Sequence, residues 1–136
     1  PIGDPHSYAL YYYTAPGDHI GYHYDTSYYK GVRYTVLIGL VSAPSCLLEY
    51  QLHTRNPERA VETSSLELQT RTLVFFNGDK LRHRITSLGT NEQRIALTFE
   101  FLTNAEMHPF MRFVSNMKDS IAYFGFKQVF KRPRRG

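Results

Sequence analysis

Short runs of β-branched and aromatic residues, separated by turn signals, recur from residue 7 to residue 102. Arg33–Val41 is a long apolar run, typical of a strand buried on both faces, whereas Arg94–Leu102 alternates between apolar and polar residues. Further strands are expected at 7–14, 22–25, 46–52, 66–68, 72–76 and 81–87, with 53–62 as an exposed loop. Roughly eight short strands is the number in a double-sheet jelly roll, so we expect an all-β core.

Helical periodicity is confined to the C-terminal part of the chain. Apolar residues there follow the i, i+3, i+4, i+7 pattern, which predicts a helix over about residues 108–123. A basic tail at 127–136 follows, and we interpret it as a solvated terminus rather than a nucleic-acid patch. A chain of 136 residues is long enough for one domain, so we expect a single domain over 1–136 with a core at about 7–102.

Composition limits the partners of the chain without naming one. A net charge of +4 favours anionic ligands in general, and nucleic acid is not expected as a partner. No apolar run is long enough to span a membrane, so no membrane partner is expected. The single cysteine, Cys46, excludes an internal disulfide and suits a reducing, cytoplasmic compartment. Oligomeric state is not indicated.

A histidine and an aspartate two residues apart suggest a metal site. In an extended strand His23 and Asp25 point to the same side, because side chains alternate between the two faces. His83, on a late strand, is the best candidate for a third ligand, and two histidines with one carboxylate are the usual ligands of non-haem Fe(II) oxygenases. His53 is a rival third ligand, but a polar loop holds a ligand less rigidly than a strand. The other histidines, for which we expect surface or hydrogen-bonding roles, are His6, His19 and His108.

Arg94 opens the last alternating run, where a buried guanidinium can pair with a carboxylate of a co-substrate through two hydrogen bonds. With this arginine, the segments 13–17 (YTAPG), 23–25 (HYD), 73–77 (LVFFN), 83–85 (HRI) and 94–98 (RIALT) stand in a specific order. Together they resemble the 2-oxoglutarate- and Fe(II)-dependent dioxygenases, in particular the prolyl 4-hydroxylase-like branch.

The resemblance implies a double-stranded β-helix fold and a set of site residues. The implied iron ligands are His23, Asp25 and His83. Arg94 would hold the distal carboxylate of 2-oxoglutarate, and Thr98 and Tyr13 would line the same pocket. Tyr11 faces the same way as Tyr13, so either tyrosine can be the one beside the co-substrate.

The implied activity is a hydroxylation that uses Fe(II), 2-oxoglutarate and O2 and releases succinate and CO2. The substrate would carry an unactivated C–H, on a protein side chain of the prolyl type or on an amino-acid-like small molecule. Asp25 favours hydroxylation, because halogenases of this superfamily have a small residue at that position. Tyr28, Tyr29 and Lys30 can form a lid or an ordinary surface loop. The arginines that can meet an acidic substrate, or simply face solvent, are Arg33, Arg82 and Arg84.

Three other interpretations remain open. The first is a metal-dependent jelly-roll enzyme that does not use 2-oxoglutarate. The second is a non-catalytic binding module whose tyrosine-rich loops and basic tail contact protein or nucleic acid. The third is base demethylation in nucleic acid by the same iron chemistry.

Overall fold

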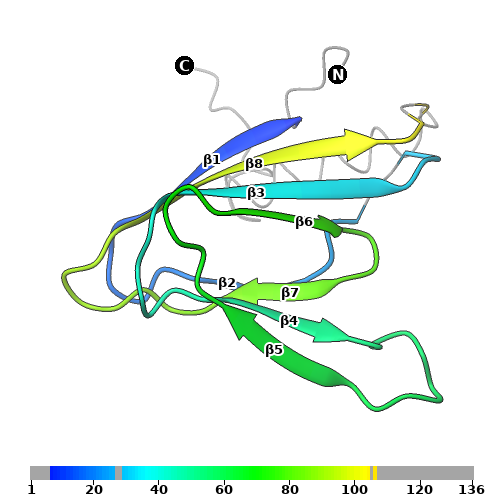
Figure 1. The fold of residues 1–136 in the computed structure, drawn as a ribbon, viewed down its shortest axis with the longest axis horizontal. Helices are drawn as coiled ribbons and strands as arrows, with labels where there is room; N and C mark the ends of the chain where they lie inside the picture. Colours follow the sequence, from blue (N-terminus) through cyan, green and yellow to red (C-terminus); the bar gives the residue numbers. More distant parts are fainter. Residues whose placement is uncertain (1–6, 27–28, 105, 107–136) are drawn as a thin grey trace, which may run out of the picture.

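The computed structural model describes residues 7–26, 29–104 and 106, which form eight β-strands. In chain order the strands are β1 (Tyr8–Tyr13), β2 (Ile20–His23), β3 (Arg33–Val41), β4 (Leu48–Leu52), β5 (Glu62–Leu66), β6 (Leu73–Asn77), β7 (Arg82–Ile85) and β8 (Arg94–Leu102). They make two four-stranded antiparallel sheets, with the orders β1-β8-β3-β6 and β2-β7-β4-β5. Figure 1 shows the sheets facing each other as two layers, which confirms the predicted jelly roll. The expected helix at 108–123 and the basic tail lie outside the described residues.

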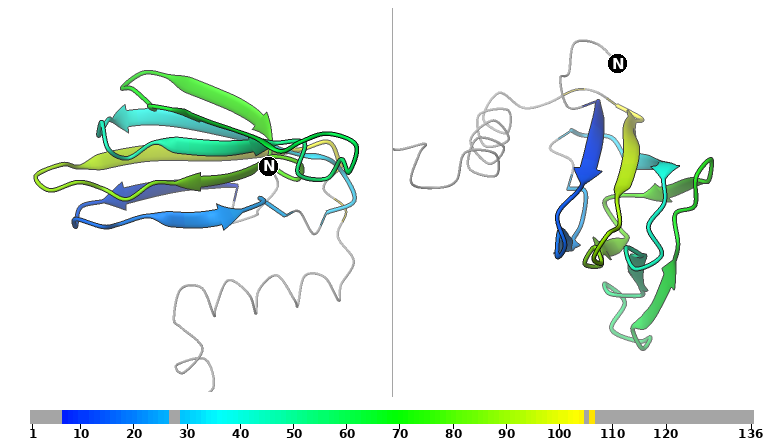
Figure 2. Two further views of the ribbon diagram at one scale, coloured as in Figure 1. Left: turned by 90° about the horizontal axis from the view of Figure 1, so that it is seen from below. Right: turned by 90° about the vertical axis from the view of Figure 1, so that its left-hand side faces the viewer.

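The chain passes from one sheet to the other at every connection except the β4–β5 hairpin. As a result, strands that are far apart in the sequence become neighbours: β2 pairs with β7, and β1 pairs with β8 (Figure 2). This topology brings His23 and His83 opposite each other, although they are 60 residues apart in the sequence.

The core lies between the two sheets and follows the alternation of the strands. On β3, Thr35 and Leu37 point inward and are buried, while the residues between them are only half-buried. On β8, Arg94 and Ala96 are buried, and the alternating apolar residues face outward. The buried apolar residues are Tyr13, Leu37, Ala43, Cys46, Leu48, Leu68, Ile85, Leu88 and Ala96.

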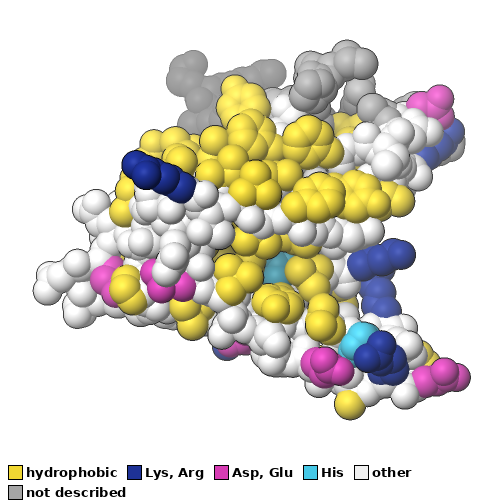
Figure 3. All heavy atoms as spheres, viewed as in Figure 1, with side chains coloured by type: hydrophobic (Ala, Val, Ile, Leu, Met, Phe, Trp, Pro, Cys, Tyr) yellow, Lys and Arg dark blue, Asp and Glu magenta, His cyan; other side chains and the backbone are white. Residues whose placement is uncertain are grey.

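The prediction that Arg33–Val41 is buried on both faces was wrong. The second sheet covers only its inner face, and no other described element covers the outer face of the β1-β8-β3-β6 sheet. Figure 3 shows apolar side chains gathered over this sheet. Exposed apolar residues on these strands include Tyr8, Leu10, Tyr12, Leu73, Phe75 and Phe101.

The bounds of β3 and β8 match the prediction and those of the other six strands differ, most informatively for β5 and β2. β5 begins at Glu62, inside the expected loop, because the polar sequence ETSSL pairs through its backbone with β4 and gives no apolar alternation to read. β2 ends at His23, so Asp25 lies beyond the strand that was expected to carry it. Among the described residues, we find no helix with the length and apolar character needed to cross a membrane.

Candidate metal centre

The two histidines of the predicted triad face each other across the β2–β7 pair. His23 and His83 are register partners, and their ring centroids are 4.3 Å apart. Both side chains point between the sheets, since each strand places alternate residues on its inner face. His83 is buried, whereas His23 is partly open to solvent, so the pair has one protected and one accessible side.

Asp25 completes the cluster from the loop after β2. Its backbone N–H donates to the Gly78 carbonyl at 3.0 Å, and Thr35 Oγ1 donates to its Oδ2 at 2.6 Å. These two bonds direct Oδ1 toward the histidines, where it lies 3.3 Å from His23 Nε2 and 3.6 Å from His83 Nε2. The ligand atoms of the three residues all lie within 4.8 Å of one another.

This cluster fits a divalent metal ion in both spacing and ring orientation. Bonds of about 2.1 Å at right angles place neighbouring ligand atoms about 3 Å apart, close to the 3.3 and 3.6 Å between Asp25 Oδ1 and the two histidine Nε2 atoms. His23 Nδ1 donates to the Gly21 carbonyl at 2.9 Å, and His83 Nδ1 donates to the Leu81 carbonyl at 3.1 Å. Such bonds fix the ring and leave Nε2 to supply its lone pair to a metal.

The charge states also suit a metal. Burial raises the pKa of Asp25, but the hydrogen bond with His23, the charge of His83 and the Thr35 hydrogen bond outweigh it, so the pKa is lowered overall. Burial is the main cause of the lowered pKa of His83. At neutral pH the cluster therefore presents a carboxylate and a neutral imidazole, the forms in which these side chains bind metal.

Gly78, which lies just after β6 and was not predicted as a site residue, also touches the cluster. A Cβ at this position would lie 2.7 Å from Asp25 Cβ and 2.7 Å from Thr35 Oγ1. Gly78→Ala should therefore displace the carboxylate and weaken Fe(II) binding about 10- to 100-fold, the range seen when the groups that orient a ligand are lost. Equilibrium dialysis against Fe(II) under argon measures the change. Gly21→Ala is the matched control, because a Cβ there meets nothing within 4 Å; equal losses in both variants would contradict the prediction.

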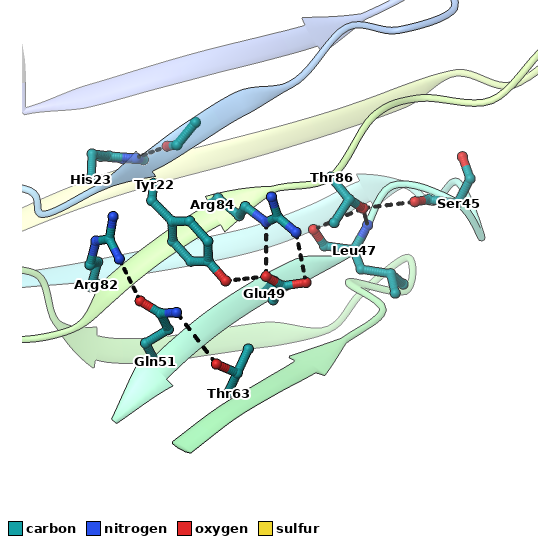
Figure 4. A network of polar contacts seen from close by, with 11 residues as sticks. Tyr22, His23, Ser45, Leu47, Glu49, Gln51, Thr63, Arg82, Arg84 and Thr86 are labelled. Atoms are coloured by element: carbon teal, nitrogen blue, oxygen red, sulfur yellow. Dashed lines mark hydrogen bonds and ion pairs between the residues drawn. The ribbon is translucent and has the colours of Figure 1, made fainter. Parts of the chain in front are cut away.

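A cluster of polar contacts on the outer face of the β2-β7-β4-β5 sheet, here called the polar clasp, joins Tyr22, Glu49, Arg82 and Arg84 and supports the histidine-bearing strands. Figure 4 shows Tyr22, adjacent to His23, donating its hydroxyl to Glu49, which also forms an ion pair with Arg84 at 2.8 Å. The guanidinium carbons of Arg84 and Arg82 lie 4.7 and 4.6 Å from the centroid of the Tyr22 ring. The clasp joins β2, β4 and β7, and it places the two arginines away from the inner face rather than toward a substrate.

Arg94 lies buried at the start of β8, with 2% of its surface exposed. Its Nε and Nη2 atoms have no hydrogen-bond partner among the described residues. Its guanidinium carbon is 4.8 Å from the centroid of the Tyr13 ring. A buried cation with unpaired donors is costly unless an anion meets it, so this position is suited to a carboxylate.

The structure separates the two candidate tyrosines. Tyr13 is the register partner of Arg94 and is 5% exposed, whereas Tyr11 pairs with Ala96 and is 40% exposed. Burial raises the pKa of Tyr13 to about 12, although Arg94 opposes the rise, so its hydroxyl stays protonated at neutral pH. Thr98 is on the same face of β8, four residues from Arg94, or about 13 Å along the strand.

The other candidate residues have different surroundings. His53 Nε2 lies 3.6 Å from Glu62, away from the triad. Arg33 forms an ion pair with Glu100 and donates to the Thr26 carbonyl at 3.2 Å. His6, His108 and Tyr28 lie outside the described residues.

No family model matches the chain, and no curated protein matches it. Solved structures do. SnoN, described as the non-heme alpha ketoglutarate dependent epimerase from nogalamycin biosynthesis, is 16% identical to this chain, with a TM-score of 0.54. The match covers 68% of this chain and 43% of the SnoN chain. ThoJ in its nickel complex, a non-heme monooxygenase, is 12% identical with a TM-score of 0.52, and the match covers 90% of this chain and 64% of the ThoJ chain. EvdO2 from Micromonospora carbonacea var. aurantiaca is 16% identical with a TM-score of 0.50, and the match covers 76% of this chain and 57% of the EvdO2 chain.

At these identities the likeness establishes the fold. The chain has the cupin-like β-fold of these three structures. It spans 43 to 64% of the length of the three structures.

Proposed function

We propose that this chain is an Fe(II)- and 2-oxoglutarate-dependent oxygenase domain, with His23, Asp25 and His83 as the iron ligands. Arg94 would hold the distal carboxylate of 2-oxoglutarate. The observation that carries the proposal is the combination of a two-histidine, one-carboxylate cluster with a buried arginine whose Nε and Nη2 lack partners among the described residues. The fold shared with SnoN and ThoJ supports it.

Iron in this cluster would supply the redox chemistry that couples decarboxylation of 2-oxoglutarate, using O2, to oxidation of a substrate C–H. The protein would position the ligand atoms and the co-substrate. Thr35 keeps Oδ1 of Asp25 turned toward the histidines, and Arg94 orients the co-substrate through two parallel hydrogen bonds. Tyr13, protonated and buried beside Arg94, would help to keep water from the charge pair between Arg94 and the co-substrate.

Hydroxylation is the reaction that we propose, with succinate and CO2 as co-products. The carboxylate of Asp25 favours it over halogenation. The name of SnoN supports a small-molecule substrate more than a protein side chain, since that enzyme acts in nogalamycin biosynthesis. The prolyl-type substrate remains the second possibility.

The decisive experiment is anaerobic addition of Fe(II) and then 2-oxoglutarate to the purified protein. We expect a weak visible charge-transfer band that needs both additions. Succinate release on admitting air, tested with candidate substrates, then identifies the reaction. A metal enzyme that does not use 2-oxoglutarate would bind Fe(II) without the band. A binding module would show no stoichiometric metal, and base demethylation would require succinate release with methylated nucleic acid.

A further inference from the structure

A hollow of about 260 Å³ lies between the end of β4 and the turn that joins β6 to β7. Phe76 forms part of its wall, and the Phe76 ring meets the His83 ring edge-on with 4.9 Å between centroids. Leu81 is also in the wall, and its carbonyl is the acceptor for His83 Nδ1. A molecule in this hollow would therefore lie one side chain away from a candidate iron ligand.

Two polar groups of the β6–β7 turn line the hollow. Within the described part of the chain the Lys80 ammonium has no ion-pair partner. The Oδ1 atom of Asn77 is buried and, within the same residues, accepts no hydrogen bond. The Asn77 carbonyl accepts from the backbone N–H of Lys80 at 3.2 Å and of Leu81 at 3.0 Å, which closes the turn. One tight turn thus places a cation and a buried hydrogen-bond acceptor without a donor beside the same hollow.

The missing partners of these two groups indicate the chemistry of a ligand that would fit the hollow. An unpaired lysine favours a carboxylate, and a buried amide oxygen without a donor favours an N–H or O–H. Leu52, Phe76 and Leu81 make much of the remaining wall apolar. The volume lies just below the range of about 300–1,000 Å³ that holds drug-sized ligands, so it suits a molecule of amino-acid size.

We propose that the hollow binds the substrate as a free amino acid or a closely related hydroxy acid with an apolar side chain. Lys80 would hold its carboxylate and Asn77 would accept from its amino or hydroxyl group. As a statement about the substrate, this inference rests on the proposed function. Binding in the hollow can be tested without turnover.

The test is isothermal titration of the metal-free protein with L-leucine, L-phenylalanine and L-proline, and with their amides. We expect at least one acid to bind saturably and its amide to bind at least tenfold more weakly. Lys80→Gln should weaken binding of the acid at least tenfold and leave the amide unchanged, while Lys80→Arg should retain binding. Lys30→Gln is the matched control for loss of one positive charge, because Lys30 pairs with Glu106 and is not in the wall.

The remaining outcomes overturn the inference: no saturable binding of any of the three acids, equal binding of acid and amide, or unchanged binding in Lys80→Gln. The charge-transfer band separates this inference from the proposed function. Lys80→Gln should show the same band and the same 2-oxoglutarate affinity as the wild type. If the wild type gives no band, the proposed function fails whatever the amino-acid titration shows; if the band forms and no acid binds, only the substrate inference fails.

Discussion

Replacing His83 with alanine is expected to abolish stoichiometric Fe(II) binding. The residue is buried, and its Nε2 lies 3.6 Å from Asp25 Oδ1 in the cluster of three candidate ligands. Loss of a group that only orients a ligand lowers metal affinity about 10- to 100-fold, so loss of the ligand itself should exceed about 100-fold. Equilibrium dialysis under argon measures the bound metal, and the charge-transfer band with 2-oxoglutarate should disappear with it.

Two further variants make this result interpretable. His83→Gln replaces the ring with a smaller polar side chain and should lose the metal as well, which answers the objection that alanine merely leaves a cavity. His53→Ala removes the rival ligand of the sequence analysis, whose ring lies near Glu62, and should bind Fe(II) as the wild type does. Thermal unfolding by circular dichroism checks that all three variants are folded. The triad would be wrong if the His83 variants kept tight Fe(II) binding or if His53→Ala lost it.

Arg94→Ala is expected to lose 2-oxoglutarate while keeping Fe(II). Removing one partner of a buried, hydrogen-bonded charge pair costs about 2–5 kcal/mol, which corresponds to about 30- to 5,000-fold in affinity. The metal ligands come from β2, β7 and the loop after β2, so deletion of a side chain at the start of β8 leaves them in place. Titration of the charge-transfer band with 2-oxoglutarate, in protein already loaded with Fe(II), measures the loss.

Arg59→Ala controls for the change in net charge, because Arg59 is an exposed residue of the β4–β5 loop that pairs only with nearby Glu62 among the described residues. Its 2-oxoglutarate affinity should match that of the wild type. Arg94→Lys should retain part of the affinity, since an ammonium keeps the charge and gives up the two parallel hydrogen bonds. Undiminished 2-oxoglutarate binding by Arg94→Ala would favour the metal enzyme that does not use this co-substrate.

Much of the fold could be predicted because strand alternation is a local property. Arg94–Leu102 was predicted with the bounds observed, and its two faces are divided as the pattern indicates. Most of β5 was not predicted because Thr63, Ser64 and Ser65 leave no apolar alternation. The half-buried outer face of β3 was not predicted for a different reason: an apolar run indicates which side chains avoid water, and not which neighbouring element covers them.

The candidate site divides in the same way. The sequence alone determined the residue types and their order, with a histidine and aspartate two apart, a later histidine and an arginine at the head of the last long strand. Only the tertiary structure decided that His83 and not His53 meets Asp25, that Tyr13 and not Tyr11 lies beside Arg94, and that Gly78 and Thr35 hold the carboxylate. The direction of a side chain repeats every two residues, so it can be predicted along one strand. These contacts instead depend on the register between strands up to about 80 residues apart, and the packing of the two sheets sets that register.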